Sequence, residues 1–355
     1  MSPAPDGVAI AFGRSDVRES TRQPDERRTG FSCEGFVRDL SEEAGDLVIE
    51  FKNILYPTDL SDESRRALTY AAAFARWYAA QLTVLHVVPT FDPIAVGPGA
   101  LNGPAQMVLP MSREEIREQL RRVIDAAGLS SLGVRVSAQG GDPARIIVDQ
   151  ALETAADLVV MGTHGRSGFE RLLVGSVAEK VVHKAPCPVL LVPPHLTAGM
   201  PPDVTFKHIL CAMDFSPAAL QALGFALDLA RQADGVVTVL HAVEWLAEED
   251  PRENAHYNVP EYRRYLVKDA QERVRTLVAE ESRDWSAIEE RVVAGRAYRE
   301  VLKAAAESGT DLIVMGAQGR GGLGLTLFGS TTQQVVRAAT CPVLTVHGAG
   351  QARVQ

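Results

Sequence analysis

Cysteine is scarce in this 355-residue chain, and its spacing argues against two classes of protein. The four cysteines, Cys33, Cys187, Cys211 and Cys341, lie far apart and form no C-x2-C pair. Such spacing argues against a disulfide framework and against a zinc site, and it favours a reducing, cytoplasmic environment. Cys187 and Cys341 each precede a proline, and we expect both to be small buried residues.

Long apolar runs and an excess of basic charge are also missing. No run approaches the roughly 20 apolar residues of a membrane-spanning helix, and the first residues do not have the pattern of a signal peptide. The formal net charge is −9, of which residues 1–50 contribute −5 through six arginines and eleven acidic residues. Because the remainder is nearly balanced, neither a membrane nor a nucleic acid is an expected partner.

Residues 1–47 lack the apolar content of a folded domain. They are rich in Arg, Asp, Glu, Ser, Pro and Gly, and their only apolar cluster before Phe31 is Val8–Phe12. This composition predicts a mostly disordered tail. An acidic arm that binds a partner is the alternative interpretation.

An internal repeat is the main feature of the remaining sequence. The segment Phe51–Leu55 returns 155 residues later, and Asp157–Gly162 returns 154 residues later. An offset that drifts by one residue indicates a duplicated domain. We expect two domains, at residues 48–193 and 206–348.

The sequence between and after these domains has a different character. Residues 194–205 contain three prolines and are expected to be a linker, and residues 349–355 a short tail.

Each copy alternates short apolar runs with amphipathic stretches. The runs of the first copy are rich in β-branched residues without polar alternation, which predicts strands buried on both faces: Ile54–Tyr56, Leu82–Val88, Val134–Ala138, Leu158–Met161 and Val189–Val192. Capping residues mark helix starts at Ser61, Ser112, Asp142 and Ser216. This βαβα order predicts an α/β fold in which a parallel sheet carries helices on both faces.

A glycine pattern follows the fourth expected strand of each copy. Both copies fit G-x2-G-x9-G-S, with the residues Gly162, Gly165, Gly175 and Ser176 in the first and Gly316, Gly319, Gly329 and Ser330 in the second. Glycines let backbone amides approach phosphate oxygens, and the Gly-Ser pair opens a helix whose free N–H groups favour an anion. Arg166 and Arg320 lie in the same loops as cationic partners. The alternative is that the glycines only make tight turns.

Asp59 and Asp214 follow the first strand of each copy. A carboxylate at this edge of the sheet can accept hydrogen bonds from ribose hydroxyls. A helix-capping role is the alternative, but Ser61 and Ser216 are better placed as caps.

Other nucleotide motifs are absent or misplaced. The chain has no G-x4-G-K-[ST] motif and therefore no P-loop lysine. A G-x-G-x-x-G match at Gly319–Gly324 lies inside the longer pattern and does not indicate a dinucleotide site. His86 and His241 end the second strands and are expected to be structural.

These residues resemble the universal stress protein family. The resemblance rests on Ile54–Asp59, Val160–Arg166 and Cys187–Val192, and it covers Phe51–Pro193 and Phe206–His347. It implies two tandem Rossmann-like domains, each a five-stranded parallel sheet of order 3-2-1-4-5. It also implies a nucleotide at the switch between strands one and four, bound by Pro57, Thr58, Asp59, Val87, Met161, Gly162, Gly165, Arg166, Gly175, Ser176 and Val177 in copy one, and by Asp214, Ala242, Met315, Gly316, Gly319, Arg320, Gly329 and Ser330 in copy two.

Copy two departs from the pattern at Ala212 and Met213, where copy one has Pro57 and Thr58. Met213 cannot donate a hydrogen bond as Thr58 can. We therefore expect copy two to be the weaker site.

The resemblance implies a protein that binds ATP, with or without Mg²⁺, in a stress-response or regulatory role. The alternative is a slow ATPase or nucleotidyl-transfer enzyme, which would need a positioned base or metal ligands at the γ-phosphate. Asp59, His164 and Ser176 are candidates, but copy two has Gln318 in place of His164, and we assign no catalytic residue. We expect the copies to pair with each other through their last strands, Val189–Val192 and Val343–Val346. Further candidate partners are a second copy of the chain and an unidentified protein.

Overall fold

The computed structural model describes both copies of the repeat. The described residues are 50–89, 112–164, 174–194, 196, 204–244, 260–281, 287–319 and 329–348. Repeat one denotes residues 50–194 and repeat two residues 204–348. The expected tails, 1–47 and 349–355, lie outside the described residues.

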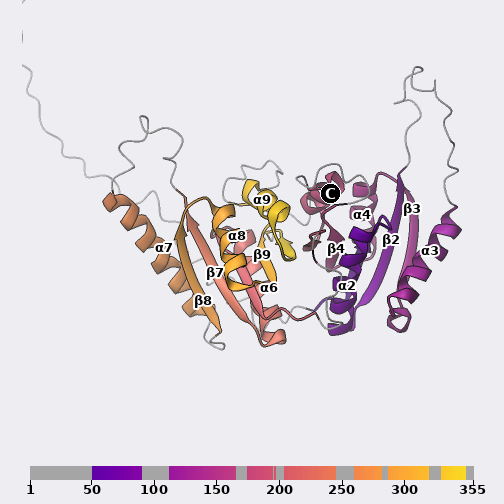
Figure 1. The fold of residues 1–355 in the computed structure, drawn as a ribbon, viewed down its shortest axis with the longest axis horizontal. Coiled ribbons are helices and arrows are strands. Elements are labelled where there is room, and N and C mark those ends of the chain that lie inside the picture. The colour runs from indigo at the N-terminus through magenta and orange to yellow at the C-terminus, as the bar shows by residue number, and fades with distance from the viewer. Residues whose placement is uncertain are drawn as a thin grey trace, which may run out of the picture. The chain divides into compact units, whose positions relative to one another are not determined.

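Repeat one alternates strands and helices in the expected order (Figure 1). Its elements are β1 (Asn53–Pro57), α2 (Asp62–Trp77), β2 (Gln81–Pro89), α3 (Arg113–Ala126), the short 3-10 helix η2 (Ser130–Leu132), β3 (Arg135–Gly141), α4 (Pro143–Glu153), β4 (Leu158–Gly162), α5 (Ser176–Lys184) and β5 (Val189–Val192).

Repeat two has the same succession. Its elements are β6 (His208–Ala212), α6 (Pro217–Ala233), β7 (Val236–Val243), α7 (Pro260–Glu281), β8 (Ile288–Ala294), α8 (Ala297–Ser308), β9 (Leu312–Gly316), α9 (Ser330–Ala338) and β10 (Val343–Val346). No helix in the described parts of the chain is both long and apolar enough to span a bilayer.

The expected capping residues begin four of the helices. The side chains of Ser61, Asp142 and Ser216 accept hydrogen bonds from backbone N–H groups in the first turns of α2, α4 and α6. Ser112 and Glu115 form the complete capping box of α3. Each cap satisfies a donor that has no partner within its helix, so these local signals fix where the helices begin.

All strands within a repeat run parallel, and the α/β class is as predicted. The order is β3-β2-β1-β4-β5 in repeat one and β8-β7-β6-β9-β10 in repeat two, which is 3-2-1-4-5 in each case. The two sets are not separate sheets, however. They join through β5 and β10 into one ten-stranded sheet.

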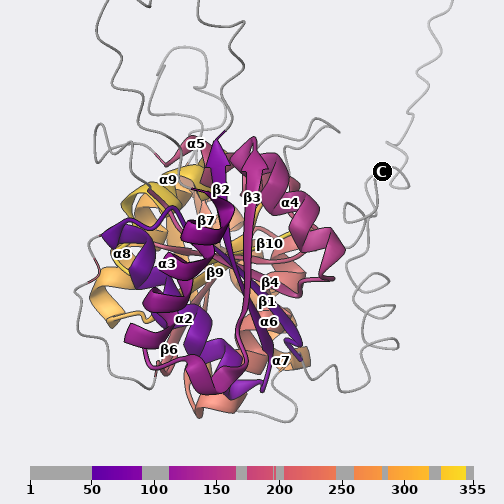
Figure 2. The same ribbon diagram turned by 90° about the vertical axis from the view of Figure 1, so that its right-hand side faces the viewer.

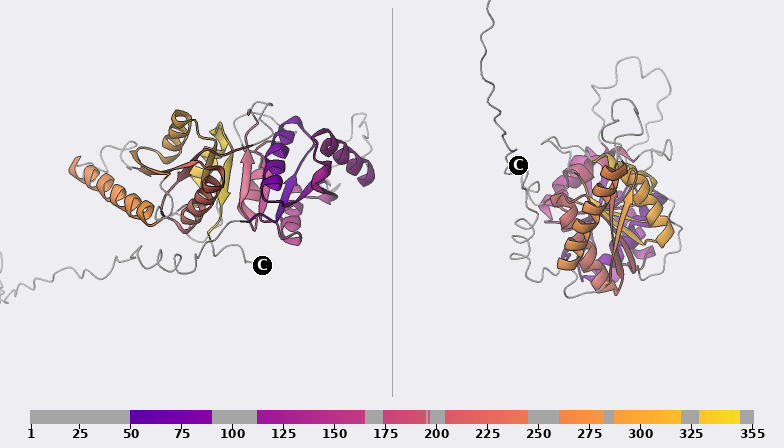
Figure 3. Two further views of the ribbon diagram at one scale, coloured as in Figure 1. Left: turned by 90° about the horizontal axis from the view of Figure 1, so that it is seen from below. Right: turned by 90° about the vertical axis from the view of Figure 1, so that its left-hand side faces the viewer.

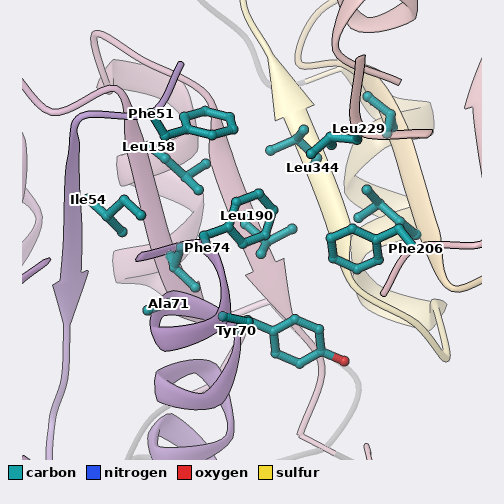
Figure 4. Packing of buried hydrophobic residues seen from close by; sticks show 14 of the residues in the cluster. Phe51, Ile54, Tyr70, Ala71, Phe74, Leu158, Leu190, Phe206, Leu229 and Leu344 are labelled. Carbon is teal, nitrogen blue, oxygen red and sulfur yellow. The ribbon is translucent and has the colours of Figure 1, made fainter. Parts of the chain in front are cut away.

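The contact between β5 and β10 is called the seam here. The two strands are antiparallel, Leu190 pairs with its repeat-two equivalent Leu344, and the flanking pairs are symmetric about this one (Figure 3). Leu190 and Leu344 are fully buried and face each other across the seam (Figure 4). The buried Thr345 hydroxyl adds a hydrogen bond of 3.1 Å to the carbonyl oxygen of Val189. Pairing the last strands satisfies backbone groups that would otherwise form an exposed apolar edge.

Helices cover both faces of the sheet, and each face has its own core. In repeat one, α2 and α3 lie on one side of β2 and β3 and α4 lies on the other (Figure 2). Side chains alternate between the cores along each strand, so Ile54 packs in the first and Leu55 in the second. Both cores contain residues of both repeats, so apolar packing is continuous across the seam.

An aromatic cluster connects the repeats within the first core. The ring of Phe51 packs on that of Phe225, with centroids 6.2 Å apart, and Tyr70 stacks on Phe206 at 6.4 Å. The Trp77 ring meets Phe206 edge-on at 5.8 Å. Aromatic pairs of this kind add to the free energy gained from burial alone.

A carboxylate fixes the entry of the chain into the first strand of each repeat. The Asp157 side chain accepts hydrogen bonds from the backbone N–H groups of Lys52 and Asn53, at 2.7 and 2.8 Å. Asp311 does the same in repeat two, with both distances 2.9 Å. Each aspartate therefore ties the first strand to the start of the fourth.

We predict that Asp157→Ala lowers the free energy of unfolding by about 1–3 kcal/mol, because two backbone donors lose a charged acceptor. Asp311→Ala should have a similar effect. Urea unfolding measures both. Asp149→Ala is the matched control, because Asp149 makes only an exposed ion pair with Arg145 at 3.5 Å. Equal free energies of unfolding for Asp157→Ala and Asp149→Ala would contradict the proposed role of Asp157 in tying β1 to β4.

A half-buried histidine, His347, follows the seam strand of repeat two. Burial lowers the pKa of His347 below its ordinary 6.5, and nearby His183 lowers it further, while the Val182 backbone offsets part of the shift. Val182 and His183 belong to α5 of repeat one, so His347 lies against the other repeat.

Stability should therefore fall as the pH drops. Between the lowered pKa of His347 and about 6.5, the unfolded chain binds more protons than the folded chain, so the free energy of unfolding decreases through this window. We predict that His347→Gln flattens this dependence. Urea midpoints measured between about pH 7.5 and about pH 5.5 test it, and an unchanged slope would rule out His347 as the cause.

Candidate functional site

The strand order reverses at equivalent places in the two repeats. β1 lies between β2 and β4, and β6 lies between β7 and β9. Chain segments leaving the carboxyl ends of β1 and β4 therefore diverge to opposite faces, and open α/β sheets bind ligands at such a switch point. The predicted site residues follow these strands.

A tight network forms the turn from β1 into α2. The Asp59 carboxylate accepts hydrogen bonds from the Ser61 backbone N–H at 3.0 Å and from the Ser61 hydroxyl at 2.6 Å. The buried Thr58 hydroxyl lies 2.9 Å from the Ser64 hydroxyl and accepts from the Leu60 N–H at 3.1 Å. Asp59 thus supports the helix start, and the Thr58 hydroxyl makes its hydrogen bonds within the protein.

Repeat two builds the same turn with different atoms. The Asp214 carboxylate accepts from the Ser216 N–H at 2.9 Å, and the Met213 sulfur accepts from the Phe215 N–H at 3.3 Å. The Met213 sulfur therefore accepts the hydrogen bond that corresponds to the one accepted by the Thr58 hydroxyl in repeat one. The hydroxyl of Thr58 is therefore no basis for expecting repeat two to be the weaker site.

Histidines brace both turns from the neighbouring strand. The Nδ1 atom of His86 lies 2.8 Å from the Thr58 carbonyl oxygen, and that of His241 lies 2.7 Å from the Met213 carbonyl oxygen. This agrees with the structural role expected for both rings.

The segment between the fourth strand and the following helix of each repeat, which carries the glycine pattern, is called the glycine loop. Backbone hydrogen bonds connect its two ends. In repeat one, Thr163 N–H donates to the carbonyl oxygen of Val192 at 3.1 Å, and Gly175 N–H donates to that of Thr163 at 2.8 Å. In repeat two, Ala317 and Gly329 make the equivalent bonds, at 2.7 and 3.1 Å. The last residue of each seam strand therefore holds the start of the adjacent glycine loop.

The first glycine of each pattern lies close to the first helix of its repeat. A Cβ on Gly316 would lie 3.0 Å from the Cβ of Ala218 and 3.2 Å from the backbone nitrogen of Ala219. A Cβ on Gly162 would be 3.8 Å from the Cα of Ser64. Close packing against α6 therefore explains part of the occurrence of Gly316, whereas a Cβ on Gly162 would make its tightest contact, 3.3 Å, with the carbonyl oxygen of His164.

The helices that follow the glycine loops begin without a side-chain cap. Gly175 and Gly329 occupy the N-cap positions of α5 and α9, and in neither helix does a described side chain accept a hydrogen bond from the first backbone N–H groups. Ser176 and Ser330, the first helical residues, are exposed. Among the described residues, no side chain caps these two N-termini, in contrast to those of α2, α3, α4 and α6, and an uncapped N-terminus favours an anion.

In repeat two, the glycine loop approaches Asp214 at Gly319. A Cβ on Gly319 would lie 2.8 Å from a carboxylate oxygen of Asp214. The predicted phosphate and ribose elements of repeat two are thus in close proximity. Gly165, Arg166 and Arg320 lie outside the described residues.

The remaining site residues are apolar and lie at the same edge. Val87, Met161 and Met315 are buried in the core on the α4, α5, α8 and α9 face, and Val177 and Ala242 pack against it. Pro57 is the last residue of β1. The structure therefore places these apolar candidates at or near the ends of β1, β2, β4, β7 and β9, except Val177, which lies in the first turn of α5.

Two features of the site had no recognised signal in the sequence. Leu60 and Phe215 adopt left-handed φ angles of 65° and 59°, although neither residue type favours them. Gly141 is the last residue of β3 and Gly295 directly follows β8, both with φ near 150°, and their recurrence 154 residues apart could have identified them.

No group of three or more His, Cys, Asp or Glu side chains that could hold a metal occurs among the residues that the structure describes. Cys187, Cys211 and Cys341 are free and buried, and burial raises the pKa of each thiol to about 12. A thiol with so high a pKa is a poor nucleophile at neutral pH. Cys33 lies outside the described residues.

Comparisons with known proteins agree with this architecture. The chain is 29% identical over 307 residues to a universal stress protein of Mycolicibacterium smegmatis, covering 83% of this chain and 96% of the relative. It is 37% identical over 142 residues to one from Methanocaldococcus jannaschii, covering 40% of this chain and 82% of the relative. A solved universal stress protein from Archaeoglobus fulgidus has the same fold, with 22% identity, a TM-score of 0.59 and coverage of 85% of this chain and 98% of that one.

The model of the universal stress protein family matches the chain twice, at residues 50–193 and 205–347. These two segments account for most of the chain and for both repeats. The chain belongs to the universal stress protein family.

Proposed function

We propose that each repeat binds ATP at its strand switch, and that nucleotide occupancy serves a stress-response or regulatory role. The observation that carries the proposal is the pair of uncapped helix N-termini behind the glycine loops. Both occur where an open α/β sheet binds its ligand, and both occur in equivalent form.

The phosphates would lie at the starts of α5 and α9. Backbone N–H groups of the first turn have no side-chain acceptor there, and the helix dipole favours negative charge. The exposed hydroxyls of Ser176 and Ser330 can donate to phosphate oxygens. Gly162, Gly165, Gly316 and Gly319 allow the backbone to approach, and Arg166 and Arg320 would add positive charge.

The adenosine would lie toward the first and second strands. Asp59 and Asp214 are held by the turns that follow β1 and β6, so the direction of each carboxylate is fixed before a ligand binds. A carboxylate has about four acceptor sites, so it can bond a ribose hydroxyl as well as the turn. Val87 and Met161, and Ala242 and Met315 in repeat two, would supply apolar contacts to the base.

We predict that Ser176→Asp and Ser330→Asp each abolish one of two ATP sites. The negative charge of an aspartate at the first helical position interacts favourably with the helix dipole, so the variant should remain folded. The same charge repels the phosphates of ATP. Isothermal titration calorimetry should show the stoichiometry falling from two to one, because ATP binding at the altered site becomes too weak to detect. Ser176→Asn and Ser330→Asn are the neutral controls.

The outcome of this experiment separates the possibilities. Two sites of unchanged affinity in the double aspartate variant would show that the helix N-termini do not bind phosphate. Absence of ATP binding by the unaltered chain would overturn the proposal itself.

We also predict ATP turnover below about 1 s⁻¹, the low end for kinases, because the sequence supplies no P-loop lysine to stabilise the transition state. Phosphate release measures this. Asp59→Asn retains the oxygen that accepts from Ser61 but removes the charge. Faster turnover that Asp59→Asn abolishes would favour the alternative, a slow ATPase or nucleotidyl-transfer enzyme.

A further inference from the structure

We infer that the two nucleotide sites are coupled, and that Glu179 and Gln333 are the positioning residues that couple them. The inference rests on the proposed function, because it concerns the same two sites. It is carried by one contact between the first turns of α5 and α9 and by the hydrogen bonds around it.

The contact joins equivalent residues of the two repeats. The Gln333 side-chain amide donates to the Glu179 carboxylate at 3.3 Å. The two positions are 154 residues apart, the offset of the repeat itself. The helices that would bind the two polyphosphates therefore contact each other directly.

Each of these residues is also bonded to the proposed phosphate loop of its own repeat. The backbone N–H of Glu179 donates to the carbonyl oxygen of Gly175 at 3.0 Å, and that of Gln333 donates to Gly329 at 2.9 Å. The N-cap glycine, the first helical turn and the contact between repeats thus form one continuous series of hydrogen bonds.

A second connection runs through the seam. The carbonyl oxygens of Val192 and Val346, at the ends of β5 and β10, hold the starts of the two glycine loops. Because β5 and β10 are paired with each other, both loop bases are fixed to one buried element. Each site is therefore joined to the other both through the sheet and through the helices above it.

The chemistry of the pair suits a coupling role. Two glutamates at this contact would repel each other, whereas a glutamate and a glutamine form a charge-assisted hydrogen bond. A ligand that orders the first turn of α5 holds Glu179, and Glu179 in turn positions Gln333 and the first turn of α9. Binding at one repeat should therefore tighten binding at the other, because less ordering remains to be done.

We expect ATP to bind repeat two about fivefold more tightly when repeat one is occupied, the low end of typical coupling. Calorimetry measures repeat-two affinity in the Ser176→Asp chain, where repeat one is empty, and in the chain with both sites filled. Linkage requires the same factor for repeat one when Ser330→Asp empties repeat two. Independent sites would give a factor of one in both directions.

Three variants test the pair. Gln333→Glu opposes two carboxylates and should reduce the coupling factor to about one. The exchanged pair, Glu179→Gln with Gln333→Glu, again places a glutamate opposite a glutamine, with the two positions swapped. It should restore the coupling factor to about fivefold. Glu179→Gln alone leaves two amides that can still bond and should retain it. Thermal unfolding of the ligand-free variants checks that each remains folded.

Each result decides the matter. Two ATP sites with independent affinities would overturn the coupling and leave the proposed function intact. Coupling that survives Gln333→Glu, or that the exchanged pair does not restore, would overturn the role of this pair. Failure of the unaltered chain to bind ATP would overturn the proposed function and the coupling together.

Discussion

Hydrogen bonding between β5 and β10 is the interaction on which the rest of this structure depends. Both strands are almost completely buried, so their backbone groups need partners, and each finds one on its outer side in the other repeat. The pairing turns two sets of five strands into one sheet and makes both apolar cores continuous across the repeats. It also fixes the two glycine loops, because Val192 and Val346 bond the residues with which the loops begin. The β5–β10 pairing therefore supports both the continuous sheet and the candidate sites.

Local signals made the strands and helix starts predictable. Val189–Val192 is an uninterrupted apolar run, and a serine at Ser61 or Ser216 identifies a helix N-terminus from a few neighbouring residues. The turns after β1 and β6 were harder, because their contacts depend on three-dimensional geometry. Thr58 looked like a ligand donor, yet its hydroxyl bonds Ser64 and Leu60. The residue types leucine and phenylalanine do not predict the left-handed backbone of Leu60 and Phe215.

Helix capping and the proposed binding of a phosphate would compete for the same backbone groups. Where Ser, Asp or a capping box satisfies the first turn, as at Ser112, the helix start is complete in itself. Glycine at position 175 or 329 leaves that requirement open. A helix of only nine residues, such as α5, gains little stability from its own hydrogen bonds and depends on packing. An incompletely capped start is therefore a cost that an anion could offset.

The symmetric register of the seam has an evolutionary consequence. When identical chains associate about a two-fold axis, a residue on the axis meets its own copy, and a substitution necessarily changes both partners. Joining the two copies in one polypeptide removes that restriction. Here Leu191 corresponds to Thr345, Glu179 to Gln333 and Thr58 to Met213, so each half has acquired side chains that the other lacks. The two halves of the interface therefore differ in their side chains although the backbone register is symmetric, so a substitution in one half leaves the equivalent residue of the other half unchanged.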